Sequence, residues 1–259
     1  MIVVGMLVTS CNKRPVVPQL PPPQPQQPSG KLSKLVYDTG AYDSLYYLAD
    51  GRLSKLVNNI DPAAGNGVNY EFKYDATGKL ERINSSEGWY YLYQYTNGKV
   101  TTISQYIDQH KSSYKFFNYT NDVLTSMEIY NYNGVARGYE FSAQHNYTFY
   151  PDGNLKEEVT HVVNGFTGQL IKHMTVEYLD YDNKFNAEEL IRQIPYYYGI
   201  VRMKNNPGKR IVKRESNGVI TTFNSQFTYD QQSKPLTKKF LYQDPSGGVI
   251  ETNTLFYYY

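Results

Sequence analysis

A recurring tyrosine-and-turn phrase constrains the fold of this chain more than any other feature. Each copy starts with Tyr, passes through a short turn containing Gly or Asn, and continues through Leu or Val and charged residues. Copies begin at Tyr47, Tyr74, Tyr95, Tyr119 and Tyr150, with a degenerate copy at Tyr229. Asp-Gly and Asn-Gly supply the positive φ angles that tight hairpin turns require. The phrase therefore predicts β-hairpins, with turns centred near Gly51, Gly78, Gly98 and Gly153.

The residues that precede these turns alternate between aromatic and other side chains. Tyr70, Phe72 and Tyr74 form one such series, and the period of two is typical of β-strands. The copies at positions 74, 95, 119 and 150 lie 21, 24 and 31 residues apart, which fits one hairpin with its connection per interval. Because consecutive hairpins usually pair with their neighbours, we expect an all-β fold. We expect this fold to be an antiparallel meander of repeated hairpins that forms one large sheet, either open or curled.

One short helix is predicted to interrupt the strands, over residues 187–194. Asn186 is a suitable N-cap residue and Pro195 ends the run. Apolar residues at i, i+3, i+4 and i+7 make one face, which we expect to pack on the sheet; they are Ala187, Leu190, Ile191 and Ile194.

The N-terminal residues are typical of an export signal. Residues 1–10 are uncharged and mostly apolar, but too few to span a bilayer, so they fit a signal peptide. The segment from Leu7 to Cys11 resembles the lipobox of bacterial lipoproteins, although the usual basic start is missing. The resemblance implies that Cys11, the only cysteine, is lipidated.

A proline-rich tether follows the cysteine. Residues 12–30 contain seven prolines, which exclude helix and central strand and favour an extended spacer. The predicted organisation is a signal peptide at 1–10, a lipidated Cys11 with its tether at 11–30, and a single β domain at 31–259.

The repeated phrase resembles the YD repeat of Rhs and teneurin-type proteins. Residues 74–80, Tyr-Asp-Ala-Thr-Gly-Lys-Leu, match it best, whereas most other copies lack the Asp after Tyr. Two further stretches, 181–186 and 204–211, resemble a family of YD-repeat-like bacterial lipoproteins of unknown function. That resemblance implies an envelope lipoprotein with an antiparallel sheet, and it implies no activity.

The composition argues against several kinds of active site. A net charge of +2, with basic residues scattered, does not favour nucleic-acid binding. The four histidines lack the spacing of a helical metal site, and we found no serine-hydrolase signature or phosphate-binding loop, so no metal, cofactor or catalytic residue is assigned. Glu157 and Glu158 are adjacent in a predicted strand and therefore point to opposite faces. A carbohydrate-active or other hydrolytic enzyme with carboxylates paired across strands remains the alternative.

The leading hypothesis is a noncatalytic cell-envelope lipoprotein, either a binding module or a scaffold, that uses the aromatic surface of its sheet. The candidate binding residues are Trp89, Tyr90, Tyr91 and Tyr93. Trp89, Tyr91 and Tyr93 share one face of their strand and Tyr90 the other, so a second layer covers one row or one row stays exposed. The membrane is an expected partner through the lipid, most simply at the outer membrane, and a glycan, a peptide or an envelope protein is the candidate ligand. Whether the domain faces the periplasm or the cell surface is left open.

Overall fold

The computed structural model describes residues 30–61, 66–184, 186–187, 193–196, 199–201, 203–243 and 248–258. Sixteen β-strands make up the fold within these residues, and each pairs antiparallel with its neighbours in the sequence. The strands are β1 (Leu32–Tyr37), β2 (Tyr42–Tyr47), β3 (Leu53–Asp61), β4 (Asn66–Tyr74), β5 (Leu80–Ser85), β6 (Trp89–Thr96), β7 (Lys99–Ile107), β8 (His110–Thr120), β9 (Val123–Asn133), β10 (Gly138–Phe149), β11 (Leu155–Val163), β12 (Leu170–Tyr181), β13 (Pro207–Arg214), β14 (Ile220–Tyr229), β15 (Pro235–Gln243) and β16 (Val249–Tyr258).

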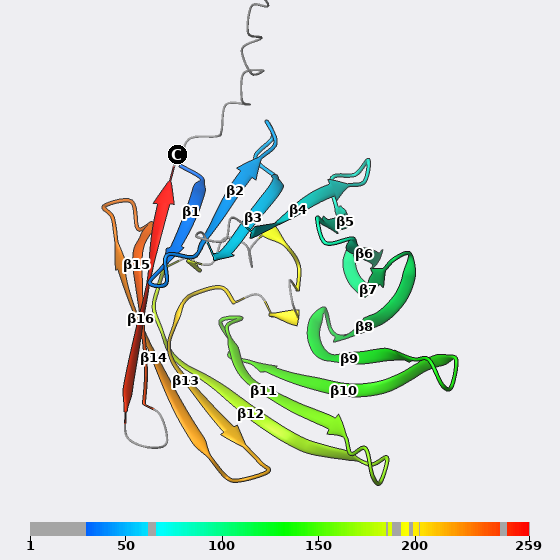
Figure 1. Ribbon diagram of the computed structural model, residues 1–259. Coiled ribbons are helices and arrows are strands. Elements are labelled where there is room, and N and C mark those ends of the chain that lie inside the picture. The colour runs from blue at the N-terminus through cyan, green and yellow to red at the C-terminus, as the bar shows by residue number, and fades with distance from the viewer. Residues whose placement is uncertain are drawn as a thin grey trace, which may run out of the picture.

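The sheet closes on itself, so the prediction of an open or merely curled sheet is wrong. The last strand, β16, pairs antiparallel with β1, with Leu35 opposite Phe256, and the ring of strands is complete (Figure 1). An open meander would leave the backbone groups of β1 and β16 unpaired at two edges, and closure removes both edges. Leu35 and Phe256 are also both buried at this seam, so closure adds apolar packing to the hydrogen bonds.

The predicted hairpins and their turns are confirmed. Gly51, Gly78, Gly98 and Gly153 each lie between two paired strands and have φ angles of 84°, 82°, 80° and 90°. The predicted helix lies mostly on residues 188–192, outside the described residues, and none of the elements delimited in the described part is a helix. Ile194, at the end of that range, is buried as expected.

Alternation along each strand separates an apolar inside from a polar outside. In β4, Tyr70 and Phe72 are buried in the core, whereas Glu71 and Lys73 between and beyond them are exposed. The core is a single cluster of buried residues that come from most of the strands and from the connection between β12 and β13. It therefore lies inside the barrel, and the opposite side of each strand faces outward.

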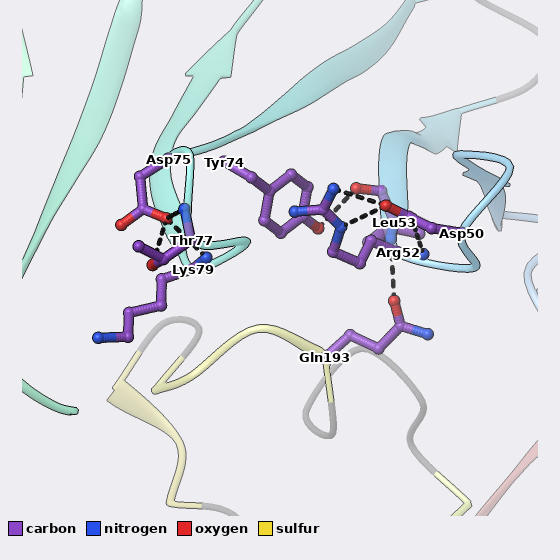
Figure 2. Close-up of polar contacts among 8 residues, drawn as sticks. All are labelled: Asp50, Arg52, Leu53, Tyr74, Asp75, Thr77, Lys79 and Gln193. Atoms are coloured by element: carbon purple, nitrogen blue, oxygen red, sulfur yellow. Dashed lines mark hydrogen bonds and ion pairs between the residues drawn. The ribbon is translucent and has the colours of Figure 1, made fainter.

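Tyrosines at the ends of several strands bond to the backbone of the preceding strand. The Tyr74 hydroxyl donates a 2.7 Å hydrogen bond to the carbonyl oxygen of Leu53, at the start of the preceding strand (Figure 2). The Arg52 guanidinium lies 4.4 Å from the centre of the Tyr74 ring and is paired with Asp50 at 2.6 Å. We call this arrangement the tyrosine clasp. The same hydroxyl-to-carbonyl bond, at 2.6–3.0 Å, joins Tyr47 to Leu32, Tyr95 to Leu80, Tyr119 to Val100, Tyr181 to Leu155 and Tyr258 to Pro235.

The clasp accounts for the composition of the phrase. A Lys or Arg precedes the clasped carbonyl and lies over the incoming ring in several copies: Lys31 over Tyr47, Arg52 over Tyr74, Lys79 over Tyr95, Lys99 over Tyr119 and Lys234 over Tyr258. The Asp after Tyr74 has a separate function. The Asp75 carboxylate accepts hydrogen bonds from the Thr77 hydroxyl at 2.7 Å and from the backbone N–H groups of Thr77 and Lys79 at 2.8 and 2.9 Å, which fixes the turn.

Described residues of the connection from β12 to β13 lie inside the barrel, where Figure 1 shows them within the ring of strands. We call the described residues of this connection, 182–184, 186–187, 193–196, 199–201 and 203–206, the inner segment. Ala187, Ile194, Val201 and Met203 are buried among side chains of the barrel wall. The Leu53 N–H donates to the Gln193 side-chain oxygen at 3.0 Å (Figure 2), so the segment also bonds to the wall through polar groups. Tyr196 of the inner segment contacts two residues of β8. The centre of its ring lies 4.4 Å from the centre of the Phe117 ring, and its hydroxyl oxygen is 2.8 Å from the Tyr119 hydroxyl oxygen.

Hydrogen bonds hold the two ends of the inner segment together. Asn206 is 2% exposed; its side-chain oxygen accepts from the Ala187 N–H at 2.6 Å, and its amide nitrogen donates to Asp182 at 3.0 Å and to the Tyr229 hydroxyl at 3.1 Å. Asn205 exchanges two hydrogen bonds of 2.9 and 3.0 Å with Asn154. The two stretches that resemble the lipoprotein family, 181–186 and 204–211, thus meet in space as the entry and exit of this segment.

The clasp predicts a specific cost for removing one hydroxyl. Tyr74→Phe removes the bond to the Leu53 carbonyl, and we expect a loss of about 1 kcal/mol in the free energy of unfolding. Urea unfolding should show a lower midpoint with an unchanged slope. Tyr132→Phe is the matched control, because Tyr132 is 49% exposed on the outer surface. Equal midpoints for the two variants would contradict the role of the clasp.

The bonds at the ends of the inner segment predict a larger effect. Asn206→Ala leaves the buried Ala187 N–H without its acceptor and removes one donor each from Asp182 and Tyr229, and we expect a loss of roughly 2–3 kcal/mol. Asn183→Ala, at an exposed position of the same segment, should change stability by less than about 0.5 kcal/mol. Thermal unfolding of both variants makes the comparison, and a loss for Asn206→Ala as small as that for Asn183→Ala would contradict this account.

Candidate functional site

The predicted binding residues of β6 are divided between the two sides of the barrel wall. Tyr91 lies opposite Ile83, which is buried in the core, so Trp89, Tyr91 and Tyr93 face inward. Tyr93 is buried, and the half-buried Trp89 packs on Tyr70 and Tyr91 with ring centres 5.6 and 5.2 Å apart. Tyr90 faces outward. The four residues therefore do not form one strip, although only Tyr93 among them is fully buried.

Tyr90 belongs to a different cluster of rings on the outside of the barrel. It stacks on Tyr106 of β7, with ring centres 4.8 Å apart and planes at 4°, and Tyr114 of β8 stacks on Tyr130 of β9 at 4.7 Å and 6°. Tyr139 of β10 meets Tyr114 edge-on at 5.3 Å. We call this cluster, which crosses β5 to β10, the outer aromatic band; it consists of Arg82, Tyr90, Tyr106, Lys111, Tyr114, Tyr130, Tyr132, Tyr139 and Phe141.

Cations and neighbouring rings cover many of the aromatic faces in this band. The Arg82 guanidinium lies 3.7 Å from the Tyr90 ring centre, and the Lys111 ammonium lies 4.6 Å from that of Tyr114. Tyr130 donates a hydrogen bond of 2.8 Å to Glu128, and this bond raises the pKa of the Tyr130 phenol. The most exposed rings are Tyr132 and Tyr139, at 49% and 38%. The band therefore offers ring edges, hydroxyl groups and cations to a partner.

The outer surface of the barrel also carries charged side chains on many of its strands. They occupy outward positions on strands from β1 to β16: Lys34, Lys55, Glu71, Lys73, Glu128, Glu157, Glu177, Lys209, Lys213, Lys239 and Glu251. In a barrel that spans a membrane, these outward positions form an apolar band about 25 Å tall. In this barrel the outward positions carry these charges together with exposed apolar side chains such as Phe116, Ile220 and Leu255.

A polar cluster lies on the inner side of β10, β11 and β12, and sequence reasoning missed it. His145 Nδ1 is 2.7 Å from Glu158 Oε1 and 3.2 Å from the Thr160 hydroxyl, and Tyr178 donates to Glu158 at 3.5 Å. Tyr147, opposite Glu158, is 5% exposed, and its hydroxyl has no hydrogen-bond partner among the described residues. Burial raises the pKa of Tyr147 well above its usual value. His145 is two residues before the inward-facing Tyr147 on the same strand, so the sequence alone predicts that His145 also faces the inside of the barrel.

The placement of the adjacent carboxylates and of the possible metal ligands is clear in the described part of the chain. Glu157 and Glu158 do face opposite sides: Glu158 lies opposite the buried Val176, and Glu157 lies opposite Glu177 on the outer surface. Within the described ranges, no group of three or more His, Cys, Asp or Glu side chains converges as a metal ion would require. No helix in the described part is long and apolar enough to cross a membrane. Cys11 lies outside the described residues.

Comparison with solved structures finds the same fold in porin-like proteins. One from Bacteroides uniformis superposes with a TM-score of 0.59 over 90% of this chain and 98% of its own length, at 12% identity. Another, from Bacteroides vulgatus, has a TM-score of 0.58 over 86% of this chain and 97% of its own, at 13% identity. At these identities the likeness shows the fold alone. No family model matches the chain, and no curated protein matches it either.

Proposed function

We propose that this chain is a noncatalytic binding module of the bacterial cell envelope, anchored by lipid on Cys11, which binds a protein partner through the outer aromatic band. The main support for this proposal is the outer aromatic band, in which stacked tyrosines lie beside Arg82 and Lys111. Elsewhere the outer surface of the barrel carries many charged side chains.

The chemistry of the band favours a protein over a glycan. A sugar ring binds to tyrosine mainly on an open aromatic face, whereas the faces of Tyr90 are covered by Arg82 and Tyr106. Tyr and Arg are enriched in the energetically important parts of protein interfaces, because they combine large contact area with hydrogen bonding. The cross-strand stacking holds the rings in place, so little side-chain entropy would be lost when a partner binds.

The charged outer surface supports anchoring by lipid rather than insertion of the barrel. Placing Glu71, Lys73 or Lys209 against hydrocarbon would cost a few kcal/mol per charge near the bilayer midplane. A lipid on Cys11, followed by the proline-rich tether, would instead hold the barrel in water beside the membrane. The porin-like fold is compatible with an outer-membrane location, with the barrel lying next to the membrane.

Anchoring through Cys11 predicts a clean separation of membrane association from folding. Cys11→Ala should move the protein from the membrane fraction to the soluble fraction, while the melting temperature of the barrel stays the same. Cell fractionation and thermal unfolding measure the two properties separately. Retention of Cys11→Ala in the membrane fraction would contradict lipid anchoring.

The outer aromatic band predicts a position-specific contact in the cell. A photo-crosslinking phenylalanine analogue at Tyr132 should give a discrete protein adduct in its native cells, whereas the same analogue at the outward, exposed Lys213 of β13 should not. Tyr139→Ser in the first variant should weaken the adduct. Equal labelling from both positions would contradict the proposal, and an adduct removed by glycan-cleaving enzymes would identify a glycan as the partner instead.

A further inference from the structure

A cavity of about 290 Å³ lies between the barrel wall and the inner segment. Lys115 of β8, Met127 and Ile129 of β9, and His145 of β10 line one side. Gly199, Val201 and Met203 of the inner segment line the other. Its volume is near the lower end of the roughly 300–1,000 Å³ typical of small-molecule sites. It is separate from the outer aromatic band, because Lys115 faces inward where its neighbour Tyr114 faces outward.

Lys115 brings a cation into this cavity, and no counter-ion pairs with it among the described residues. The side chain lies between the inward residues Ile103 and Ile129 of the adjoining strands. No salt bridge or hydrogen bond of its ammonium group is found in the part of the chain that the structure describes. Burial lowers the pKa of Lys115. Because unpaired charges are costly to bury, an anion that paired with this group would gain from relieving that cost.

The acid that lines the same cavity already has a partner. Glu158 Oε1 lies 2.7 Å from His145 Nδ1, and Glu158 also accepts from the Tyr178 hydroxyl at 3.5 Å. Glu158 is therefore held within its own cluster by hydrogen bonds, whereas the ammonium group of Lys115 has no such partner among the described residues. The rest of the lining is largely apolar, with Met127, Ile129, Leu155, Ile200, Val201 and Met203.

The inner segment approaches Lys115 at a residue whose backbone conformation favours glycine. Gly199 has a φ angle of 82°, and a Cβ there would lie 3.3 Å from the Lys115 ammonium and 3.4 Å from the Met127 methyl. The absence of a side chain at this position thus keeps the space around the ammonium open. Polarizable methionines at 127 and 203 adapt readily to apolar ligands of different shapes.

We propose that this cavity binds a small amphipathic monocarboxylate, with its carboxylate on the Lys115 ammonium and its apolar chain among Met127, Ile129 and Met203. A single cation with apolar walls suits a singly charged acid better than a phosphate, which brings more charge than one lysine can neutralise. This site goes beyond the proposed binding of a protein on the outside, and either can exist without the other.

Calorimetric titration of the purified full-length chain with octanoate, octanol and octylamine tests the assignment. We expect octanoate to bind at least 10-fold more tightly than octanol, and Lys115→Met to remove that preference while octanol binding stays the same. Lys73→Met, at an exposed outward position of β4, is the matched control and should leave octanoate binding unchanged. Equal binding of acid and alcohol, stronger binding of the amine, or no effect of Lys115→Met would overturn the proposal.

A second measurement does not depend on a variant that folds. The chain has five methionines, so methyl-labelled protein gives a simple NMR spectrum. Octanoate should shift the methyl signals of Met127 and Met203 and show direct magnetisation transfer from its chain to them, while Met174 on β12, which does not line the cavity, stays unchanged. Absence of transfer to either Met127 or Met203 at saturating octanoate would overturn the proposal.

Discussion

Closure of the sheet between β1 and β16 is the constraint on which the rest of the structure depends. It pairs two strands from opposite ends of the domain and leaves no edge strand in the ring. Closure also creates an inside. Wall side chains alone fill a barrel of about eight strands, whereas barrels of sixteen strands leave a wide lumen. In this chain the inner segment occupies part of that lumen, and its buried Ala187, Ile194, Val201 and Met203 join the core of the wall. The cavity beside Lys115 is space left between the two.

The tyrosine-rich composition follows from the way the ring is built. The ladder of backbone bonds pairs every strand with its two neighbours, and a side-chain bond between strands adds to that ladder in several places. The clasp supplies this bond, since one residue type provides a ring that covers the core and a hydroxyl that reaches the previous strand. The clasps at Tyr47 and Tyr258 involve β1–β2 and β15–β16, so the same contact is made on both sides of the closing seam. Asn205 and Asn206 then hold the inner segment at its entry and exit.

The sequence predicts local structure well and long-range pairing poorly. The hairpins and their glycine turns follow from residues next to each other, and so does the placement of Glu157 and Glu158 on opposite faces. Closure was missed because β1 and β16 are more than 200 residues apart, and nothing in either strand marks the other as its partner. Alternation correctly put Tyr90 on the other face from Trp89, Tyr91 and Tyr93. Finding Tyr106 and Tyr114 beside it requires the register, which shifts at a bulge between Gln105 and Tyr106. The cluster at His145 and Glu158 likewise needs the pairing of β10 with β11.

The closed ring separates two surfaces with different chemistry, and both proposals rest on that separation. The outside carries charges and the outer aromatic band, and the inside carries the core, the inner segment and Lys115. Hydrogen exchange of the backbone amides in β1 and β16 tests closure most directly, because paired amides exchange only when the structure opens. We expect residues 34–37 and 254–257 to be protected about as strongly as the paired residues of β8 and β9. Rapid exchange of alternate amides along both β1 and β16, with protection retained in β8 and β9, would show two open edges and contradict a closed barrel.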